Sequence, residues 1–276
     1  MKKLNISPDT RPLIMGILNV TPDSFSDGGR FNNIDSALTQ AEAMLAAGVD
    51  IIDIGGESTR PGAPEVSELD ELERVIPIIN RLKQEFDCAI SLDTSKAIVM
   101  QAGIESGIDL INDVCALSQP NALEVAAQTD IPVCLMHMQG TPRTMQKSPI
   151  YQDVIGDVKD FFEQKIAICE NAGIQRERLI LDPGFGFGKT LQHNYELLNR
   201  FSEFQSLGLP LLAGLSRKSM LGNLLNIGPD ERMLSSVVAA TIAMSNGANI
   251  LRVHDVAETQ QAVTIFNATK YGVINE

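Results

Sequence analysis

Eight short apolar runs recur along the chain, and they limit its fold more than any other feature. Each run is nearly continuous in hydrophobic character, as in parallel strands that are buried on both faces. Longer stretches with helical periodicity lie between the runs. The runs cover residues 14–18, 51–54, 90–92, 110–111, 133–136, 179–181, 211–213 and 250–251.

The stretches between the runs predict helices that cover the outside of a parallel sheet. Strand–helix alternation repeated eight times favours a closed (β/α)₈ TIM barrel over an open doubly wound sheet. One such barrel needs ~250 residues. The chain has 276 residues, and no internal repeat, linker or low-complexity segment divides it. We therefore expect an α/β fold with one domain over residues 1–276, with helices that include 36–47, 68–86, 96–106, 154–172 and 230–246.

Charge and composition exclude several classes of protein. A net charge of −13 and an isoelectric point near 4.7 argue against nucleic-acid binding and against docking on anionic membranes. No apolar run approaches the ~20 residues that a membrane span needs, and no signal-peptide cleavage site follows residues 13–18. The cysteines are widely spaced and form no CxxC pair, which favours reduced thiols in the cytoplasm: Cys88, Cys115, Cys134 and Cys169.

A polar or ionisable residue follows every apolar run, and three long loops, 21–33, 55–67 and 139–151, begin at the same ends. In a TIM barrel these ends form the catalytic face. Taken singly, Asp93, Asn112 and Asp182 are interpreted equally well as helix N-caps, and Arg60 and Lys218 as solvated charges. A cavity lined by all eight ends explains the whole pattern.

The segments at the strand ends together resemble the signatures of the dihydropteroate synthases. The similarity extends from about residue 13 to about residue 268, shows no departure at a motif position, and is of the monofunctional bacterial type. The segments are MGILNVTPDSFSDGG (15–29), DIGGESTRPG (53–62), DTSK (93–96), ND (112–113), MHMQG (136–140), DPGFGFGK (182–189), SRKS (216–219) and RVHD (252–255).

The resemblance implies a transferase of folate biosynthesis. This family joins 6-hydroxymethyl-7,8-dihydropterin pyrophosphate to 4-aminobenzoate and releases 7,8-dihydropteroate and pyrophosphate, and sulfonamides compete for the aminobenzoate site. It also implies Mg²⁺ beside Asn19 and a homodimer. Helix 230–246 and the last helix are candidate dimer surfaces, and their simple packing on the barrel is an equally good interpretation.

Site residues carried over by the resemblance fall into three groups. A pterin slot would use Asp93, Asn112, Asp182 and Lys218. A pyrophosphate clamp would use Asn19, Arg60, Arg252 and His254. The aminobenzoate seat would use Phe25, Thr59, Pro61, Phe187, Lys218 and Ser219. Of these residues Asp93, Arg60 and Lys218 would be catalytic. The glycine and proline content of loops 21–33 and 55–67 predicts that they order when pyrophosphate is present. Asp53 and His137 keep a structural interpretation.

Two alternatives share the fold. A pterin-binding methyltransferase-like domain would have the same carboxylate-lined pocket, but it would not need residues 21–29 or 216–219. A catalytically silent paralogue would bind pterins without turnover, and the intact basic residues argue against it: Arg60, Lys218, Arg252 and His254.

Overall fold

Eight parallel strands form the centre of the computed structural model, which describes residues 4, 6–21, 30–58, 62–140, 145 and 149–273. Most strands run one or two residues further than the apolar runs, so several polar residues pair inside the sheet. The strands are β1 (Leu13–Asn19), β2 (Ile51–Gly55), β3 (Ala89–Asp93), β4 (Leu110–Asp113), β5 (Val133–Met136), β6 (Leu179–Asp182), β7 (Leu212–Ala213) and β8 (Ile250–Val253).

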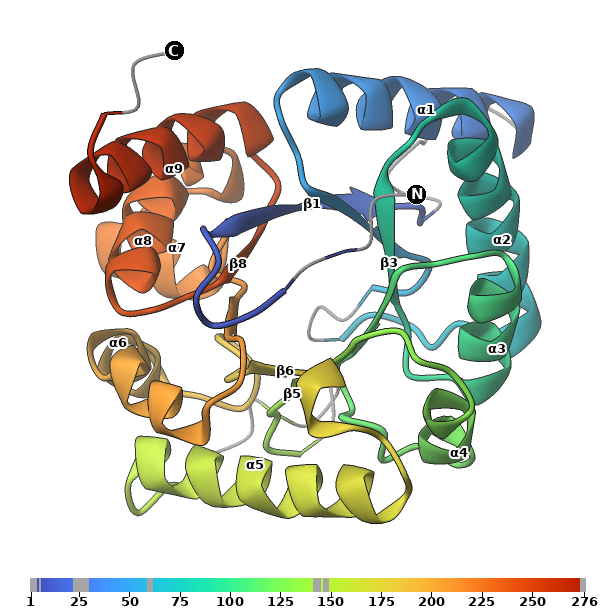
Figure 1. Cartoon of the computed structure of the whole chain (residues 1–276). Helices are drawn as coiled ribbons and strands as arrows, with labels where there is room; N and C mark the ends of the chain where they lie inside the picture. The colour runs from blue at the N-terminus through green and yellow to red at the C-terminus, as the bar shows by residue number, and fades with distance from the viewer. Residues whose placement is uncertain are drawn as a thin grey trace.

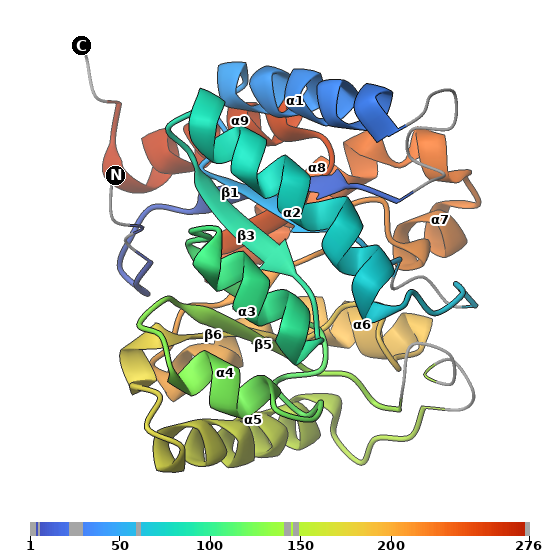
Figure 2. The same cartoon turned by 90° about the vertical axis from the view of Figure 1, so that its right-hand side faces the viewer.

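The sheet closes on itself, which confirms the predicted barrel. Its strand order is β6-β5-β4-β3-β2-β1-β8-β7, and a parallel bridge between Leu181 and Leu211 joins the two ends. Figure 1 shows the helices as a ring around the strands, and Figure 2 shows them from the side. The helices are α1 (Arg30–Ala46), α2 (Glu68–Glu85), α3 (Ala97–Glu105), α4 (Ala122–Ala127), α5 (Val154–Asn171), α6 (Leu191–Asn199), α7 (Ser219–Leu225), α8 (Met233–Ser245) and α9 (Val256–Tyr271).

Helix boundaries differ from the prediction in three places. The first loop ends before residue 33, because α1 begins at Arg30. The helix predicted from residue 230 begins as a separate 3₁₀ turn, Pro229–Glu231, and α8 starts at Met233. Thirdly, α4, α6 and α7 follow from the predicted alternation of strands and helices, but no bounds were predicted for them.

Alternation along the strands separates an outer core from an inner plug. Side chains one position apart point to opposite faces, so Ile14 packs under the helices while Met15 points into the barrel. The inner plug fills the N-terminal half of the barrel. It consists of Leu13, Met15, Ile51, Leu110, Cys134, Ile180, Leu212 and Ile250.

Polar side chains stand one layer above this plug. They occupy the position two residues further along the same strand, which faces the same side. The pairs are Ile51 and Asp53, Leu110 and Asn112, Ile180 and Asp182, and Ile250 and Arg252. The barrel interior is therefore apolar at its N-terminal end and polar at its C-terminal end.

At the N-terminal face, a repeated two-point clamp fixes pairs of strands. A Gly-x-Asp or Gly-x-Asn pattern ends α1, α3 and α8, at residues 48–50, 107–109 and 247–249. The Asp109 N–H donates to the Ile90 carbonyl (2.7 Å), and the Asp109 carboxylate accepts from the Ile90 N–H (2.8 Å). Asp50 clamps Ile14 in the same way, and Asn249 clamps Leu211. Each glycine has a positive φ, between 82° and 99°, which lets the chain turn from helix to strand.

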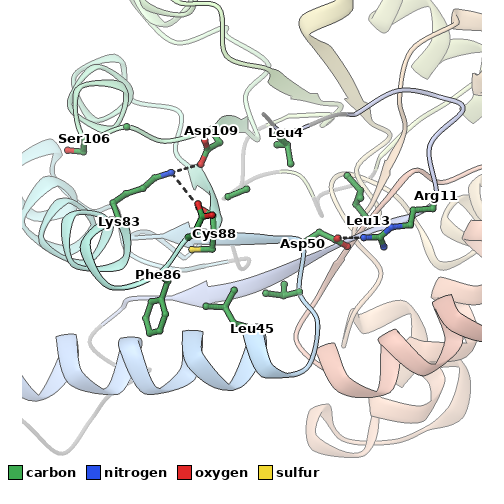
Figure 3. Close-up of a pocket in the computed structure, with 14 residues that line it drawn as sticks. Leu4, Arg11, Leu13, Leu45, Asp50, Lys83, Phe86, Cys88, Ser106 and Asp109 are labelled. Carbon is green, nitrogen blue, oxygen red and sulfur yellow. Dashed lines mark hydrogen bonds and ion pairs between the residues drawn. The ribbon is translucent and has the colours of Figure 1, made fainter. Parts of the chain in front are cut away.

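A hollow of about 530 Å³ opens beside two of these clamps (Figure 3). Two ion pairs border it, Arg11 with Asp50 and Lys83 with Asp109, each 2.6 Å long. Phe86 is among its apolar lining residues. This hollow lies at the end of the barrel opposite the polar layer.

Replacing Asp109 by alanine tests the clamp. The Ile90 N–H would stay buried without an acceptor, so we expect the free energy of unfolding to fall by about 2 kcal/mol. Urea denaturation measures this change. Asp109→Asn keeps an acceptor oxygen and should recover most of the loss.

Asp87→Ala is the matched control, because Asp87 lies exposed on the same face. It should leave the free energy of unfolding within about 0.5 kcal/mol of the original value. Equal losses in the Asp87 and Asp109 variants would refute the clamp.

Candidate active site

The polar layer at the C-terminal ends of the strands brings together most of the described residues of the predicted site. Backbone register aligns Asn19 with Gly55, Gly55 with Asp93, and Asp93 with Asn112 across β1 to β4. Parallel pairing puts these strand ends at one level, so their inward side chains converge. Phe25, Thr59, Arg60 and Pro61 lie outside the described residues.

Arg252 bridges two carboxylates inside the barrel. Its Nε lies 2.6 Å from the Asp53 carboxylate, and its Nη2 lies 2.7 Å from the Asp93 carboxylate. The Asn112 amide also donates to Asp53, at 3.3 Å. The structure thus places Arg252 with the residues expected to hold the pterin, and Asp53 holds Arg252 and Asn112 from below.

Asp53 was predicted to be structural, and its position in this network was not foreseen. The signal was present in the sequence. Asp53 stands two residues after Ile51, the same spacing that separates Asn112, Asp182 and Arg252 from their plug residues.

Burial governs the charge state of this network. It raises the pKa of Asp93 to about 7, outweighing the attraction of Arg252, and the nearby carboxylate of Asp53 adds to the rise. Burial alone would lower the pKa of Arg252, but the carboxylates of Asp53 and Asp93 raise this pKa by more than burial lowers it. The guanidinium therefore stays charged. Asp93 therefore titrates near neutral pH beside a permanent cation.

Asp182 ends β6 with only 6% of its surface exposed. One of its oxygens accepts the Gly184 N–H at 2.8 Å, which fixes the plane of the carboxylate. Burial raises its pKa, while this hydrogen bond and then Lys218 oppose the rise. The N-cap interpretation of Asp93, Asn112 and Asp182 is wrong, because α3, α4 and α6 each have a different N-cap residue further along the chain.

Lys218 follows β7 and reaches toward the β6 loop. Its Nζ lies 4.1 Å from the centre of the Phe187 ring, within cation–π range. Burial, and then Arg252, lowers the pKa of Lys218 to about 8. The preceding Arg217 has a φ of +55° and pairs with Asp255 at 2.6 Å, so the turn that presents Lys218 is pinned.

His254 lies just beyond β8 beside the same turn. The Ser216 hydroxyl oxygen accepts the His254 N–H at 3.1 Å and lies 3.0 Å from Nδ1. Burial, Arg252 and Arg217 together lower the pKa of His254 to about 4. At neutral pH this histidine is an uncharged hydrogen-bonding group. Ser219, the first residue of α7, is exposed.

An apolar cluster borders the polar layer, and of its residues only Phe187 was predicted to belong to the site. Met136, Met145 and Phe187 form a buried cluster, with Val114 and Met138 packed against it. Flat apolar surface of this kind suits the face of a ring system. Methionines on both sides of His137, at the end of the fifth strand, were the available signal.

The space beside Gly55 is bordered by oxygen atoms of Asn19 and Asp93, which bears on the expected Mg²⁺. A Cβ atom on Gly55 would lie 3.8 Å from the Asn19 amide oxygen and 3.7 Å from a carboxylate oxygen of Asp93, so the glycine keeps this space open. Oxygen atoms are the ligands that Mg²⁺ prefers. The described residues contain no cluster of three or more His, Cys, Asp or Glu side chains able to hold a metal. The Asn19 amide and the Asp93 carboxylate are therefore oxygen donors of the kind that Mg²⁺ accepts.

Comparisons with known proteins agree with this geometry. Residues 15–254 match the family described as pterin binding enzyme. The dihydropteroate synthase of Escherichia coli K12 is 56% identical over 260 residues, which cover 94% of this chain and 92% of the relative. No helix in the described part of the chain is long and apolar enough to cross a membrane.

Two solved structures show the same barrel. The Yersinia pestis dihydropteroate synthase in a sulfonamide drug complex has a TM-score of 0.92 and 56% identity, and covers 98% of both chains. The Xanthomonas albilineans dihydropteroate synthase in complex with 7,8-dihydropteroate has a TM-score of 0.87 and 43% identity, and covers 96% of both chains. The chain therefore belongs to the pterin-binding enzyme family, among its dihydropteroate synthases.

Proposed function

We propose that this enzyme is a transferase that joins 6-hydroxymethyl-7,8-dihydropterin pyrophosphate to 4-aminobenzoate, giving 7,8-dihydropteroate and pyrophosphate. The observation that carries the proposal is the polar layer itself. Carboxylates, an amide and two cations converge above an apolar plug and beside an apolar wall. A flat heterocycle with a polar edge and a charged leaving group matches that arrangement.

The pterin edge is assigned to Asp182 and Asn112. A pterin presents a ring N–H and an amino group side by side, and one carboxylate accepts both in a planar, charge-assisted contact. The Gly184 N–H holds the Asp182 carboxylate in one orientation before the substrate arrives. Lys218 is assigned to the carbonyl side of the ring.

Bond cleavage places positive charge on the pterin methylene group. The C–O bond breaks, its electron pair leaves with pyrophosphate, and the arylamine nitrogen then bonds to the carbon and loses a proton. Asp93, in its ionised form, stabilises the developing cation. Arg252 holds that carboxylate in place at 2.7 Å.

The leaving group is assigned to the rim of the barrel. We place pyrophosphate near Asn19, Arg60 and His254, with Arg252 deeper and already paired to carboxylates. Mg²⁺ bound beside Asn19 would neutralise charge on the departing oxygens. 4-Aminobenzoate is assigned to the seat formed by Phe25, Thr59, Pro61, Phe187, Lys218 and Ser219.

We also propose a single pterin-binding domain over residues 1–276 that acts as a cytoplasmic homodimer. The four cysteines are all free, in keeping with a reducing compartment. Helix α8 contains no charged residue, and Leu234, Val238 and Ile242 expose 71%, 52% and 43% of their surfaces along one stripe. An exposed apolar stripe of this kind is typical of a subunit interface.

An assay of pyrophosphate release that depends on 4-aminobenzoate tests the proposed reaction, with dihydropteroate identified by mass. Pterin binding without release would instead indicate a silent paralogue. Methyl transfer from a methylated pterin cofactor would indicate the methyltransferase alternative.

Asp182→Ala should abolish measurable pterin binding. Losing a buried, charge-assisted pair of hydrogen bonds costs about 3 kcal/mol or more, which is at least a 100-fold fall in affinity. Calorimetry with the pterin measures this change. Affinity within a few-fold of the original would remove Asp182 from the slot.

The pH dependence of kcat/KM should be bell-shaped. Asp93 is ionised above its pKa of about 7, and Lys218 is charged below its pKa of about 8, so activity should fall on both sides of that interval. The charged groups that face Asp93 are Arg252, Asp53, Glu71 and Asp113. Asp93→Asn should be slower and lack the acidic limb, whereas an unchanged acidic limb would assign it to another group.

A double substitution in the α8 stripe, Leu234→Glu with Val238→Glu, should dissociate the proposed dimer. Burying unpaired charge in an apolar interface costs several kcal/mol, so the dissociation constant should rise about 100-fold or more. Sedimentation equilibrium gives the result. Ile150→Glu, which changes an exposed isoleucine outside α8, is the control and should leave the assembly intact.

A further inference from the structure

Lys189 is a buried lysine that the proposed reaction does not use, and burial lowers its pKa to about 7. It exposes 2% of its surface and lies at the end of the glycine-rich segment 182–189. Its Nζ lies 3.0 Å from His137 Nδ1 and donates to the carbonyls of Gly184 (2.9 Å) and Phe187 (3.1 Å). Three acceptors therefore match the three N–H groups of the ammonium.

The histidine is suited to accept one of these bonds. Burial and the nearby Lys189 charge hold the pKa of His137 far below its ordinary value, so its ring is neutral. A neutral ring has one unprotonated nitrogen, and Nδ1 facing the ammonium is that acceptor. Lys189 thereby connects the end of β5 to the loop after β6.

The loop that Lys189 holds lies directly on the backbone of residues 137–139. Gly184 has a φ of +72°, and a Cβ there would stand 2.0 Å from the His137 carbonyl oxygen. Gly188 has a φ of +62°, and a Cβ there would stand 2.5 Å from the Gln139 carbonyl oxygen. The glycines permit this close approach of two backbone segments. The Lys189 Nζ joins the same two segments, because it contacts His137 on one and the carbonyls of Gly184 and Phe187 on the other.

Phe187 and Lys218 depend on this loop. The Phe187 ring lies 4.1 Å below the Lys218 Nζ, and a Cβ on Gly186 would lie 3.4 Å from the Lys218 side chain. A shift of the loop would therefore move both Phe187 and the lysine that rests on it. Asp182 and Asn112 stand on strands of the barrel instead.

We infer that Lys189 is a positioning residue that sets the 4-aminobenzoate seat by fixing Phe187 and, through it, Lys218. The inference rests on the proposed function, since it assigns Lys189 to one of the two substrates. Phe187 belongs to the loop alone, Asn112 belongs to a strand, and Asp182 and Lys218 contact both parts of the site, since the Gly184 N–H orients Asp182 and Phe187 lies against Lys218.

Lys189→Met keeps the length of the side chain and removes all three hydrogen bonds. We expect KM for 4-aminobenzoate to rise about tenfold or more, and KM for the pterin pyrophosphate to rise by a clearly smaller factor, because Asn112 and the strand that carries Asp182 stay in place. Hydrogen exchange at the Gly186 and Phe187 amides should also become faster. This second readout does not depend on turnover.

Tyr151→Phe is the matched control, because the Tyr151 hydroxyl donates to the Gly188 carbonyl at the outer side of the same loop (2.7 Å). It should leave both KM values near those of the unaltered enzyme. If Lys189→Met does not fold, His137→Phe removes one of the three acceptors and should shift the same KM by a smaller factor.

Three results would overturn the inference. They are unchanged KM values despite faster loop exchange, an equal rise in both KM values, and a Tyr151→Phe effect as large as that of Lys189→Met. Failure of the proposed function would look different, because the unaltered enzyme would then show no aminobenzoate-dependent release, and loop exchange in Lys189→Met would still report on the loop.

Discussion

The bridge from Arg252 to Asp53 and Asp93 is the interaction on which the interior of this barrel depends. Ionised groups are expensive to bury unless they are paired and hydrogen-bonded. Here one guanidinium contacts two carboxylates from different strands, at 2.6 and 2.7 Å, and Asn112 occupies further acceptor capacity on Asp53. The pairing stabilises a polar layer one step above the apolar plug, and it fixes Asp93 where we propose that its carboxylate stabilises the developing cation.

The N-terminal end of the barrel holds hydrogen bonds that stabilise the fold, and the C-terminal end holds the polar residues of the site. At the N-terminal end, Asp50, Asp109 and Asn249 each satisfy both backbone groups of a residue on the neighbouring strand. That clamp fixes strand register, and register in turn decides which side chains face inward. A slip of one residue in strand register would replace Asp93 by a neighbour that faces outward. The hydrogen bonds of Asp50, Asp109 and Asn249 at the N-terminal end therefore help to position the polar layer at the C-terminal end.

Much of this arrangement was predictable from the sequence, for physical reasons. Buried parallel strands leave continuous apolar runs, so the barrel and all eight strands were predicted correctly. The positions of Asn112, Asp182 and Lys218 followed from their places at strand ends. The bounds of α4, α6 and α7 were not predicted, and helices this short depend on packing against the barrel.

Other features could not be predicted from the sequence, because they depend on contacts between residues far apart in the chain. The role of Asp53 depends on Arg252, which is 199 residues away in the chain. Glycines in a segment such as 182–189 can bind phosphate or permit close backbone packing, and here they pack against residues 137–139. Sequence spacing cannot distinguish these uses, because both require glycine for the same conformational freedom.

The balance of charge supports the proposal that the pterin and the pyrophosphate bind in different parts of the mouth. The described slot holds three carboxylates, Asp53, Asp93 and Asp182, against two cations, Lys218 and Arg252, while His254 is neutral at pH 7. When Asp93 is ionised, these carboxylates outnumber the two cations by one, a balance that we propose favours a cation at the pterin carbon over a polyanion. The raised pKa of Asp93 has the same origin. Pyrophosphate is therefore better held at the rim, where additional positive charge is required, and a proposed Mg²⁺ beside Asn19 together with Arg60 would supply it.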